Sequence, residues 1–290
     1  MPIDTEDPHV GMESVHSIRE RGSAPRTIVE HAGFRYVDGT LSDTGISLAR
    51  EVPYTLFVND HEILSIATLP SYLAELFTGF LVSEGVLESP DEIEECDVDH
   101  GSKLVRFEIA VPEQRLEAVL RQGMLTSGCA GGMVYSVQTG VLPRTEPRVP
   151  LRLRCEAILD RMRELDRFPG IYKVTRGVHA SSVATPEQTI IILEDLGRHN
   201  AVDKIVGYCF LNRVETSDKL LLTTGRVTSE VLTKAGRSKF PIVVSRSSAS
   251  SMAVAMAENV RVDVVTYVRG NRFNYFSFGG AELLDNRPRP

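Results

Sequence analysis

The chain has 290 residues, of which 42% are hydrophobic and 24% charged, a composition ordinary for a globular protein of one large or two modest domains. The formal net charge of −7 argues against a general nucleic-acid binder, and no apolar run is long enough to predict a membrane span. The four cysteines lie far apart without a CxxC pair, which argues against a disulfide framework or a four-cysteine zinc site and favours a reducing cytoplasm.

The first part of the chain predicts a polar tail followed by a small α+β domain. Residues 1–24 lack the apolar stretch of a secretory signal, and we expect them to be a disordered tail. YTLFVNDHEILSIAT predicts a β-hairpin around Asn59 and Asp60, and the next segment repeats apolar residues at helical spacing. KLVRFEIAV alternates like a strand, and PEQRLEAVLRQG predicts a short helix with proline at its start. These elements assign residues 25–123 to the α+β domain.

Residues 124–150 are expected to form a flexible loop and connector. The stretch TSGCAGGMVYS places Cys129 among glycines and other small residues, where the backbone is most permissive. A cysteine kept for packing usually lies in an apolar run, so this placement favours an exposed and reactive thiol. The residues alone leave open that Cys129 is an incidental loop cysteine.

Residues 151–290 are predicted to form an α/β domain. From about residue 171, short apolar runs alternate with helical patterns, the runs being TIIILEDL, KLLLTTG, PIVVSRS and VDVVTYV. Continuous apolar strands between helices are typical of a parallel sheet covered on both faces. We therefore expect a three-layer α/β/α domain with right-handed crossovers.

A basic residue follows each of these predicted strands. Ligands of such sheets bind beyond the carboxyl ends of the strands, where helix N-termini offer free N–H groups that suit phosphate. Solvated loop arginines are also common, but the repetition in an acidic chain favours a site for a phosphate-bearing cofactor. The arginines are Arg198, Arg226, Arg246, Arg269 and Arg272.

Two further segments carry candidate residues. EDLGRHNAVDK is the densest polar cluster, and it is either structural, with Asn200 as a helix cap and Asp195 paired with Arg198, or a cofactor wall that includes His199. In GVHASS, His179 precedes an alanine, but no glutamate or P-C-x-x-C follows as in zinc deaminases. Zinc hydrolysis is therefore rejected, and a structural or a catalytic role for His179 stays open.

The segments EDLGRHNAVDKIVG, TTGRVTSE, GVHASS and TSGC together resemble the formate dehydrogenase accessory protein family of FdhD-type sulfurtransferases. The likeness extends from YTLFVND through RGNRFNYF and covers most of the chain beyond about residue 50. The resemblance implies a cytoplasmic, homodimeric sulfur carrier. A cysteine desulfurase loads a persulfide on Cys129, and the sulfur passes to the molybdenum or tungsten bis-guanine-dinucleotide cofactor of formate dehydrogenase. It also implies a cytidine-deaminase-like fold for the C-terminal domain.

The resemblance also implies which residues form the site. Cys129 is the expected catalytic residue, no metal ligands are expected, and the segment after the last strand contributes to cofactor binding. Many members carry a second loop cysteine three positions after the first, where this chain has Gly132, so an internal disulfide cannot form and the client enzyme stays open. The candidate cofactor-binding residues are Tyr267, Val268, Arg269, Gly270, Asn271, Arg272, Arg198, His199, Arg226, Arg246 and His179.

Two other functions are compatible with these residues. The first is a non-catalytic chaperone that binds the guanine-dinucleotide cofactor at the arginine-lined edge and delivers it, with Cys129 incidental. The second is a thiol hydrolase, which would need a base beside Cys129, and the sequence does not place His179 or His199 there.

Overall fold

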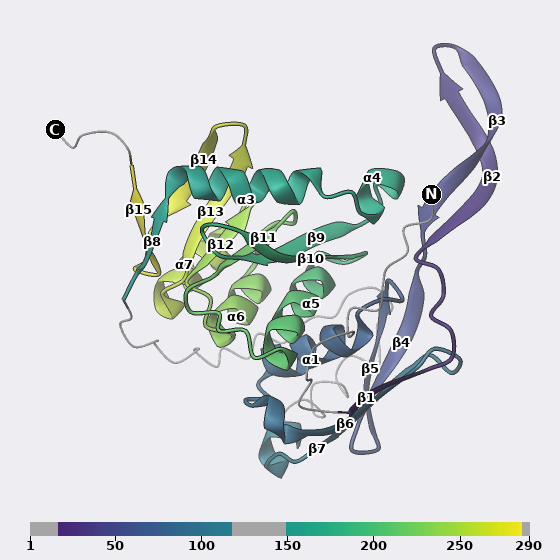
Figure 1. Cartoon of the computed structure of the whole chain (residues 1–290), viewed down its shortest axis with the longest axis horizontal. Coiled ribbons are helices and arrows are strands. Elements are labelled where there is room, and N and C mark those ends of the chain that lie inside the picture. Colours follow the sequence, from purple (N-terminus) through teal and green to yellow (C-terminus); the bar gives the residue numbers. More distant parts are fainter. Residues whose placement is uncertain (1–16, 118–148, 286–290) are drawn as a thin grey trace.

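The computed structural model describes residues 17–117 and 149–285 (Figure 1). These residues form an N-terminal half built on a five-stranded sheet and a C-terminal half built on a six-stranded sheet. Cys129 and Gly132 lie outside the described residues. The mixed α/β class that the sequence predicts is confirmed.

The N-terminal sheet has the strand order β1-β6-β7-β4-β5 and is covered by helix α1. The predicted hairpin is present: Asn59 and Asp60 both have positive φ, 46° and 63°, which is the type I′ turn that matches the twist of paired strands. The elements of this half are β1 (Ser17–Arg21), β4 (Val52–Val58), β5 (His61–Thr68), α1 (Leu73–Glu84), the short 3-10 helix η1 (Pro90–Glu92), β6 (Ile93–Asp99) and β7 (Leu104–Ile109).

The predicted boundary of the N-terminal tail at residue 24 is wrong. Ser17–Arg21 form β1, which pairs in parallel with β6 at the edge of the sheet. Arg21 lies opposite Asp99 in this pairing, and its side chain forms an ion pair with Asp97 on the same strand. The polar composition of the segment hid the strand, because an edge strand can be polar on its exposed side.

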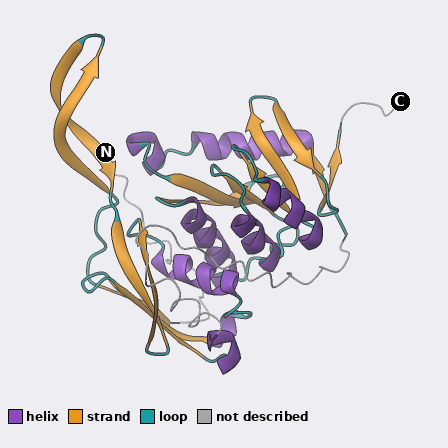
Figure 2. Ribbon diagram, turned by 180° about the vertical axis from the view of Figure 1, so that it is seen from behind, coloured by secondary structure: helices purple, strands orange, loops and turns teal. Residues whose placement is uncertain are grey.

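Between β1 and β4 the chain forms a long two-stranded ribbon, the β2–β3 arm, which the sequence analysis did not predict. β2 (Ile28–Val37) and β3 (Thr40–Ala49) pair antiparallel over their full length through a turn at Asp38 and Gly39. Figures 1 and 2 show the arm projecting away from the rest of the molecule.

The C-terminal sheet has the strand order β10-β9-β11-β12-β13-β14. Helix α3 covers one face, and α5, α6 and α7 cover the other, as two separate clusters of buried side chains show. The alternation in β11 demonstrates this, since Leu220 and Leu222 face α3 whereas Leu221 faces the other helices. The elements are β9 (His179–Ala184), β10 (Thr189–Asp195), β11 (Leu220–Thr223), β12 (Ile242–Ser245), β13 (Asp263–Arg269), β14 (Arg272–Phe276), α3 (Cys155–Arg167), α4 (Ile171–Thr175), α5 (Arg198–Leu211), α6 (Ser229–Arg237) and α7 (Ser251–Val260).

The expected three layers are therefore present, but the sheet is mixed rather than parallel. β9 runs antiparallel between β10 and β11, and β14 runs antiparallel at the edge. β9 escaped prediction as a strand because its sequence, HASSVA, is small and partly polar, and a short hairpin joins it to β10. β10, β11, β12 and β13 still point the same way. A separate two-stranded sheet pairs β8 (Leu151–Arg154) with β15 (Ala281–Leu284).

The two halves meet where α1 crosses α5. The backbones touch at this crossing: a Cβ added to Gly79 would lie 1.9 Å from the carbonyl oxygen of Asp203, and one added to Gly207 would lie 1.8 Å from that of Glu75. Only glycine permits so close an approach. Beside the crossing, Ser83 of α1 donates a hydrogen bond to Asp203 of α5 at 3.0 Å.

Candidate functional site

The candidate site is the edge of the C-terminal sheet where β10 to β13 end, called here the strand-end edge. β9 runs the opposite way, so its first residue, His179, lies at this edge opposite Asp195, the last residue of β10. Three helices begin here: α5 after Gly197, α6 after Thr228 and α7 after Ser250. Their N-terminal N–H groups give the edge the positive partial charge that suits an anionic ligand.

Two of these three helices have side-chain N-caps. Thr228 accepts a hydrogen bond from the backbone N–H of Val231, and Ser250 accepts one from Ala253. The N-cap of α5 is Gly197 rather than the predicted Asn200, and it makes no side-chain hydrogen bond. Asn200 donates instead to the carbonyl of Ala67 at 3.1 Å and to Asp195 at 2.8 Å.

His179, Arg198 and His199 gather at the strand-end edge. Burial lowers the pKa of His179 below its usual 6.5, and the nearby Arg198 and His199 lower it further. The Nδ1 atom of His179 lies 3.3 Å from the hydroxyl of Thr224. His179 is therefore held in its neutral form beside two potential cations.

Arg198 and His199 each keep a buried polar atom without a hydrogen-bond partner among the described residues. Nδ1 of His199 is paired with the carboxylate of Glu230 in the first turn of α6, while its Nε2 is unsatisfied. Nε of Arg198 is likewise unsatisfied, and the arginine stem lies so close to Gly225 that a Cβ there would be 2.7 Å from Cβ of Arg198. Such groups retain the capacity to bind a polar ligand.

The other strand-end arginines differ in their surroundings. Arg226 is exposed, and no other described residue pairs with its guanidinium. Arg246 instead forms an ion pair with Asp166 of α3 at 2.9 Å, so part of its charge is already neutralised. Arg226 is therefore the more available of the two for an anion.

The segment Tyr267–Arg272 closes β13 and begins β14. Tyr267 is 47% exposed, whereas Val268 is 2% exposed and packs in the core beneath α3, so only the backbone of Val268 is available to a ligand. Gly270 has a positive φ of 58° in the turn. Arg269 of β13 and Arg272 of β14 lie opposite each other across the turn, as backbone partners in the two strands. Asn271 and Arg272 line a cavity of about 530 Å³ with residues of α3, among them Cys155, Glu156, Leu159 and Arg163.

The buried residues of the EDLGRHNAVDK segment hold the fold together. The carboxylate of Glu194 accepts hydrogen bonds from the first N–H groups of α4, from Ile171 at 2.6 Å and Tyr172 at 3.0 Å. Asp195 is fully buried and pairs with Lys204 at 2.7 Å, not with Arg198 as the structural interpretation of this segment assumed. Asp195 also accepts from the N–H of Leu69 at 3.3 Å, which ties the segment to the N-terminal half. Arg198 and His199 of this segment keep buried polar atoms without a partner among the described residues.

Glu230 is a residue that the sequence analysis missed. Its position two residues into a capped helix was visible in TTGRVTSE, but its pairing with His199 depends on two helices that are far apart in the sequence. Behind it, Lys234 lies 3.7 Å from Glu230 and 2.7 Å from Asp203. A chain of polar side chains, half-buried at His199 and Glu230 and buried at Lys234 and Asp203, therefore runs to the crossing of α1 and α5.

The described cysteines narrow the choice of reactive thiol. Cys96 and Cys209 are buried in the two cores, and burial raises the pKa of both thiols, that of Cys209 to about 12. Such thiols are protonated at neutral pH and poor nucleophiles. Cys155 is half-buried at the α3 cavity. Cys129, the predicted carrier, lies outside the described residues.

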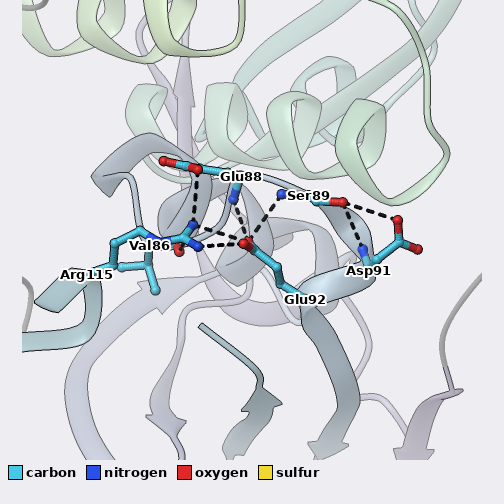
Figure 3. A network of polar contacts seen from close by, with 6 residues as sticks. All are labelled: Val86, Glu88, Ser89, Asp91, Glu92 and Arg115. Atoms are coloured by element: carbon cyan, nitrogen blue, oxygen red, sulfur yellow. Dashed lines mark hydrogen bonds and ion pairs between the residues drawn. The ribbon is translucent and has the colours of Figure 1, made fainter. Parts of the chain in front are cut away.

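The last described residues before position 118 are firmly held (Figure 3). Arg115 forms an ion pair with Glu92 at 2.6 Å and donates to the carbonyl of Val86 at 3.1 Å. Glu92 also accepts from the N–H groups of Glu88 and Ser89, completing the capping box of η1. The segment that carries Cys129 therefore departs from a fixed point on the N-terminal half.

Within residues 17–117 and 149–285, no group of three or more histidine, cysteine, aspartate or glutamate side chains could hold a metal ion. In the same ranges, every helix is too short or too polar to cross a membrane.

The mixed three-layer α/β half joined to a smaller α+β half is the fold of a solved formate dehydrogenase accessory protein. The crystal structure of a protein of that description from Desulfotalea psychrophila is similar, with a TM-score of 0.68 and 26% identity over 87% of this chain and 97% of that one. The FdhD/NarQ family model matches residues 49–281, and the chain belongs to this family.

Curated relatives match more than four fifths of the chain. The protein named sulfur carrier protein FdhD from Bacillus subtilis is 31% identical over 244 residues, which are 84% of this chain and 93% of the relative. The protein of the same name from Listeria monocytogenes serotype 4b is 31% identical over 258 residues, which are 86% of this chain and 97% of the relative.

Proposed function

We propose that this protein is a sulfur carrier that accepts persulfide sulfur on Cys129 and transfers it to the molybdenum or tungsten bis-guanine-dinucleotide cofactor required by formate dehydrogenase. The names of its curated relatives and its structural neighbour support a sulfur-carrying accessory role. The burial of Cys96 and Cys209 removes both as alternative carriers. Its partners are a cysteine desulfurase and formate dehydrogenase, and it acts in the cytoplasm as a homodimer.

The loading step needs one thiolate. The Cys129 thiolate attacks the terminal sulfur of the persulfide on the desulfurase, a new S–S bond forms on Cys129, and the donor cysteine leaves as a thiolate. Atoms and electrons balance without an added oxidant, and no second thiol takes part. Gly132 in place of a second cysteine is therefore compatible with the carrier role.

The substrate cofactor is bound through its phosphates at the strand-end edge. The observation that carries this proposal is the meeting of three helix N-termini with the unsatisfied Arg198 and His199 in a chain of net charge −7. Arg226 and Arg272 supply further exposed guanidinium groups. The remaining residues of Tyr267–Arg272 offer backbone groups and the Tyr267 ring to the guanine-dinucleotide.

Intact-mass spectrometry tests the carrier step. After incubation with a cysteine desulfurase and cysteine, the wild-type chain should gain about 32 Da, one sulfur atom, on Cys129. Cys129→Ser should take up no sulfur and should fail to activate formate dehydrogenase, whereas Cys155→Ser, the matched control at the half-buried thiol, should behave like wild type. Full client activity in Cys129→Ser contradicts the carrier role.

A second candidate function is a chaperone that binds and delivers the guanine-dinucleotide cofactor without handling sulfur. The strand-end edge favours it, because phosphate binding there does not require Cys129. Two variants separate the functions. If Cys129→Ser still activates the client, the chaperone function replaces the carrier function. If Gly132→Cys activates the client and wild type does not, sulfur transfer needs two thiols and the single-thiol mechanism is wrong.

A further inference from the structure

The contact between His199 and Glu230 fixes which nitrogen of the imidazole ring carries a hydrogen. Nδ1 of His199 is paired with Oε2 of Glu230, in the first turn of α6. The buried ammonium group of Lys234 lies 3.7 Å from Oε1 of Glu230 and compensates the negative charge of this carboxylate. A carboxylate only accepts hydrogen bonds, so Nδ1 is the protonated nitrogen when His199 is neutral. Nε2 then presents a lone pair.

Nε2 of His199 is one of two orphaned polar atoms at the start of α5. It is buried without a hydrogen-bond partner among the described residues, and so is Nε of Arg198. The His199 side chain as a whole is 21% exposed, so the ring reaches the surface of the protein. Buried polar atoms in folded proteins nearly always have a partner. Because both residues lie in the first turn of a helix, the partner that fits this place is an anion.

A phosphate oxygen cannot pair with His199 while the ring is neutral. The oxygen and Nε2 would then both offer lone pairs, and no hydrogen would lie between them. Nε2 becomes a donor when it takes up a proton from solvent, and the imidazolium then donates from Nδ1 to Glu230 and from Nε2 to the phosphate. Phosphate binding at this atom therefore requires a proton as well.

The charged groups around His199 couple the proton to the phosphate. Glu230 and Lys234 lie against His199 on α6, Arg198 precedes it on α5, and His179 lies nearby on β9. The pKa of His179 is lowered by burial and by the charges of Arg198 and His199, so His179 favours its neutral form. The permanent charge of Arg198 opposes a second positive charge beside it, whereas Glu230 favours one. A phosphate that contacts Arg198 and His199 offsets this repulsion, so the proton and the phosphate promote each other's binding.

We propose that His199, oriented by Glu230, binds a phosphate of the nucleotide ligand as an imidazolium, so that ligand binding takes up a proton. Glu230 is a positioning residue, because it acts on the ligand only through His199. The inference rests on the phosphate binding proposed above for the strand-end edge. It adds that the affinity of this edge for the ligand increases as the pH falls, and that Glu230 sets this dependence.

The test is titration calorimetry of the full-length protein with guanosine diphosphate (GDP), in two buffers that differ in ionisation enthalpy. The buffer dependence of the measured enthalpy counts the protons taken up with each GDP. The titrations run between about pH 7 and about pH 8.5, where a phosphate group is mostly doubly ionised. Wild type should take up at least about half a proton per GDP, and its affinity should therefore fall at least about threefold per pH unit as the pH rises.

Glu230→Gln separates the positioning role from a purely structural one. The amide carries no charge to balance an imidazolium, so proton uptake and the pH dependence of GDP affinity should both fall to near zero. A purely structural Glu230 would instead lower the affinity by the same factor at every pH. Glu258→Gln, at an exposed carboxylate near the end of α7, is the matched control and should retain wild-type proton uptake. Thermal melting checks that both variants are folded.

NMR of the histidine ring nitrogens gives a second measurement that needs no change at Glu230. In wild-type protein with ¹⁵N-labelled histidine, addition of GDP should move the Nε2 signal of His199 from the range of a bare nitrogen to that of a protonated one. The signal is assigned by its absence in His199→Gln. An Nε2 signal that stays in the range of a bare nitrogen at saturating GDP contradicts the proposal.

The outcomes distinguish this inference from the proposed function. GDP binding by wild type without proton uptake overturns the inference and leaves phosphate binding at the edge standing. Wild-type uptake in Glu230→Gln also overturns it, and so does loss of uptake in His179→Gln, which would assign the proton to the other histidine. Absence of GDP binding by wild type overturns both the inference and the phosphate-binding part of the proposed function. The persulfide assay on Cys129 is independent of all these outcomes.

Discussion

The two sides of the EDLGRHNAVDK segment differ sharply in their surroundings. On the inner side, Asp195 and Lys204 are fully buried and paired with one another, and Glu194 binds the N-terminus of α4. On the outer side, Arg198 and His199 face the strand-end edge with polar atoms that no described residue satisfies. One stretch of sequence therefore both joins the two halves of the molecule and forms part of the candidate site, and substitutions on the two sides should affect different measurements.

The largest effect is expected on the inner side. Lys204→Met leaves the carboxylate of Asp195 buried without its cation, and the loss of one partner of a buried pair costs about 3–5 kcal/mol. Urea denaturation should show this loss in the free energy of unfolding. The double variant Asp195→Asn with Lys204→Met should be the more stable of the two, since it buries no unpaired charge. If Lys204→Met were as stable as the double variant, Lys204 would not be the cation that compensates the buried Asp195 carboxylate.

The helix crossing should be the next most sensitive feature. Gly207→Ala places a methyl group against the backbone of Glu75 and forces α1 and α5 apart, which should cost about 3 kcal/mol, the upper end of the overpacking range. Gly236→Ala in α6 is the matched control, because its new Cβ meets only side-chain atoms of Val260 at 3.3 Å or more. Thermal melting measures both, and equal melting temperatures for the two variants would show that the crossing is not so tight.

On the outer side the effect should appear in binding rather than in stability. Arg226→Ala and Arg272→Ala each remove a charge-assisted contact worth about 1.5–3 kcal/mol, which corresponds to roughly a ten- to hundredfold loss of guanine-nucleotide affinity. Because both side chains are exposed, the free energy of unfolding should change by no more than about 0.5 kcal/mol. Titration calorimetry tests the affinity, with Arg35→Ala on the arm as a control. Unchanged affinity in both variants would exclude phosphate binding at this edge.

The smallest effect concerns the pH dependence of stability. The pKa of His179 is lowered in the folded protein, chiefly by burial, so the unfolded chain takes up this proton first as the pH falls. The contribution of neutral His179 to stability is therefore complete above pH 6.5 and decreases as the pH falls through 6.5 toward the lowered folded value. His179→Gln should flatten the fall of melting temperature in this range, whereas His61→Gln at an exposed position of β5 should not. An unaltered slope in His179→Gln would show that the residue is not desolvated.

Local patterns predicted much of this architecture. Alternating and continuous apolar runs gave the β4–β5 hairpin, α1 and four co-directional strands, because burial on one or both faces dictates these periods. Side-chain chemistry narrowed the cap of α6 to Thr228 or Ser229 and that of α7 to Ser248 or Ser250, and the structure has Thr228 and Ser250. The common location of the arginines after β10 to β13 follows from strand direction, because co-directional strands place all four following loops at one edge of the sheet.

The features that escaped prediction depend on contacts between distant parts of the chain. The antiparallel β9 has small residues and no clear period, and β1 is polar enough to resemble a tail. The choice of Lys204 rather than Arg198 as the partner of Asp195 is set by the helical turn of α5, which carries Arg198 outward. The glycine crossing could not be inferred, because neither glycine indicates by itself which backbone it approaches.

The contact of Gly79 with Gly207 has a mechanical consequence. Two helices whose backbones touch have no layer of side chains between them that could rearrange. The two helices are therefore held rigidly against each other at the crossing. Helix α5 runs from this crossing to the strand-end edge, where its first two residues are Arg198 and His199. We therefore expect α1 and α5 to move together when either helix is displaced.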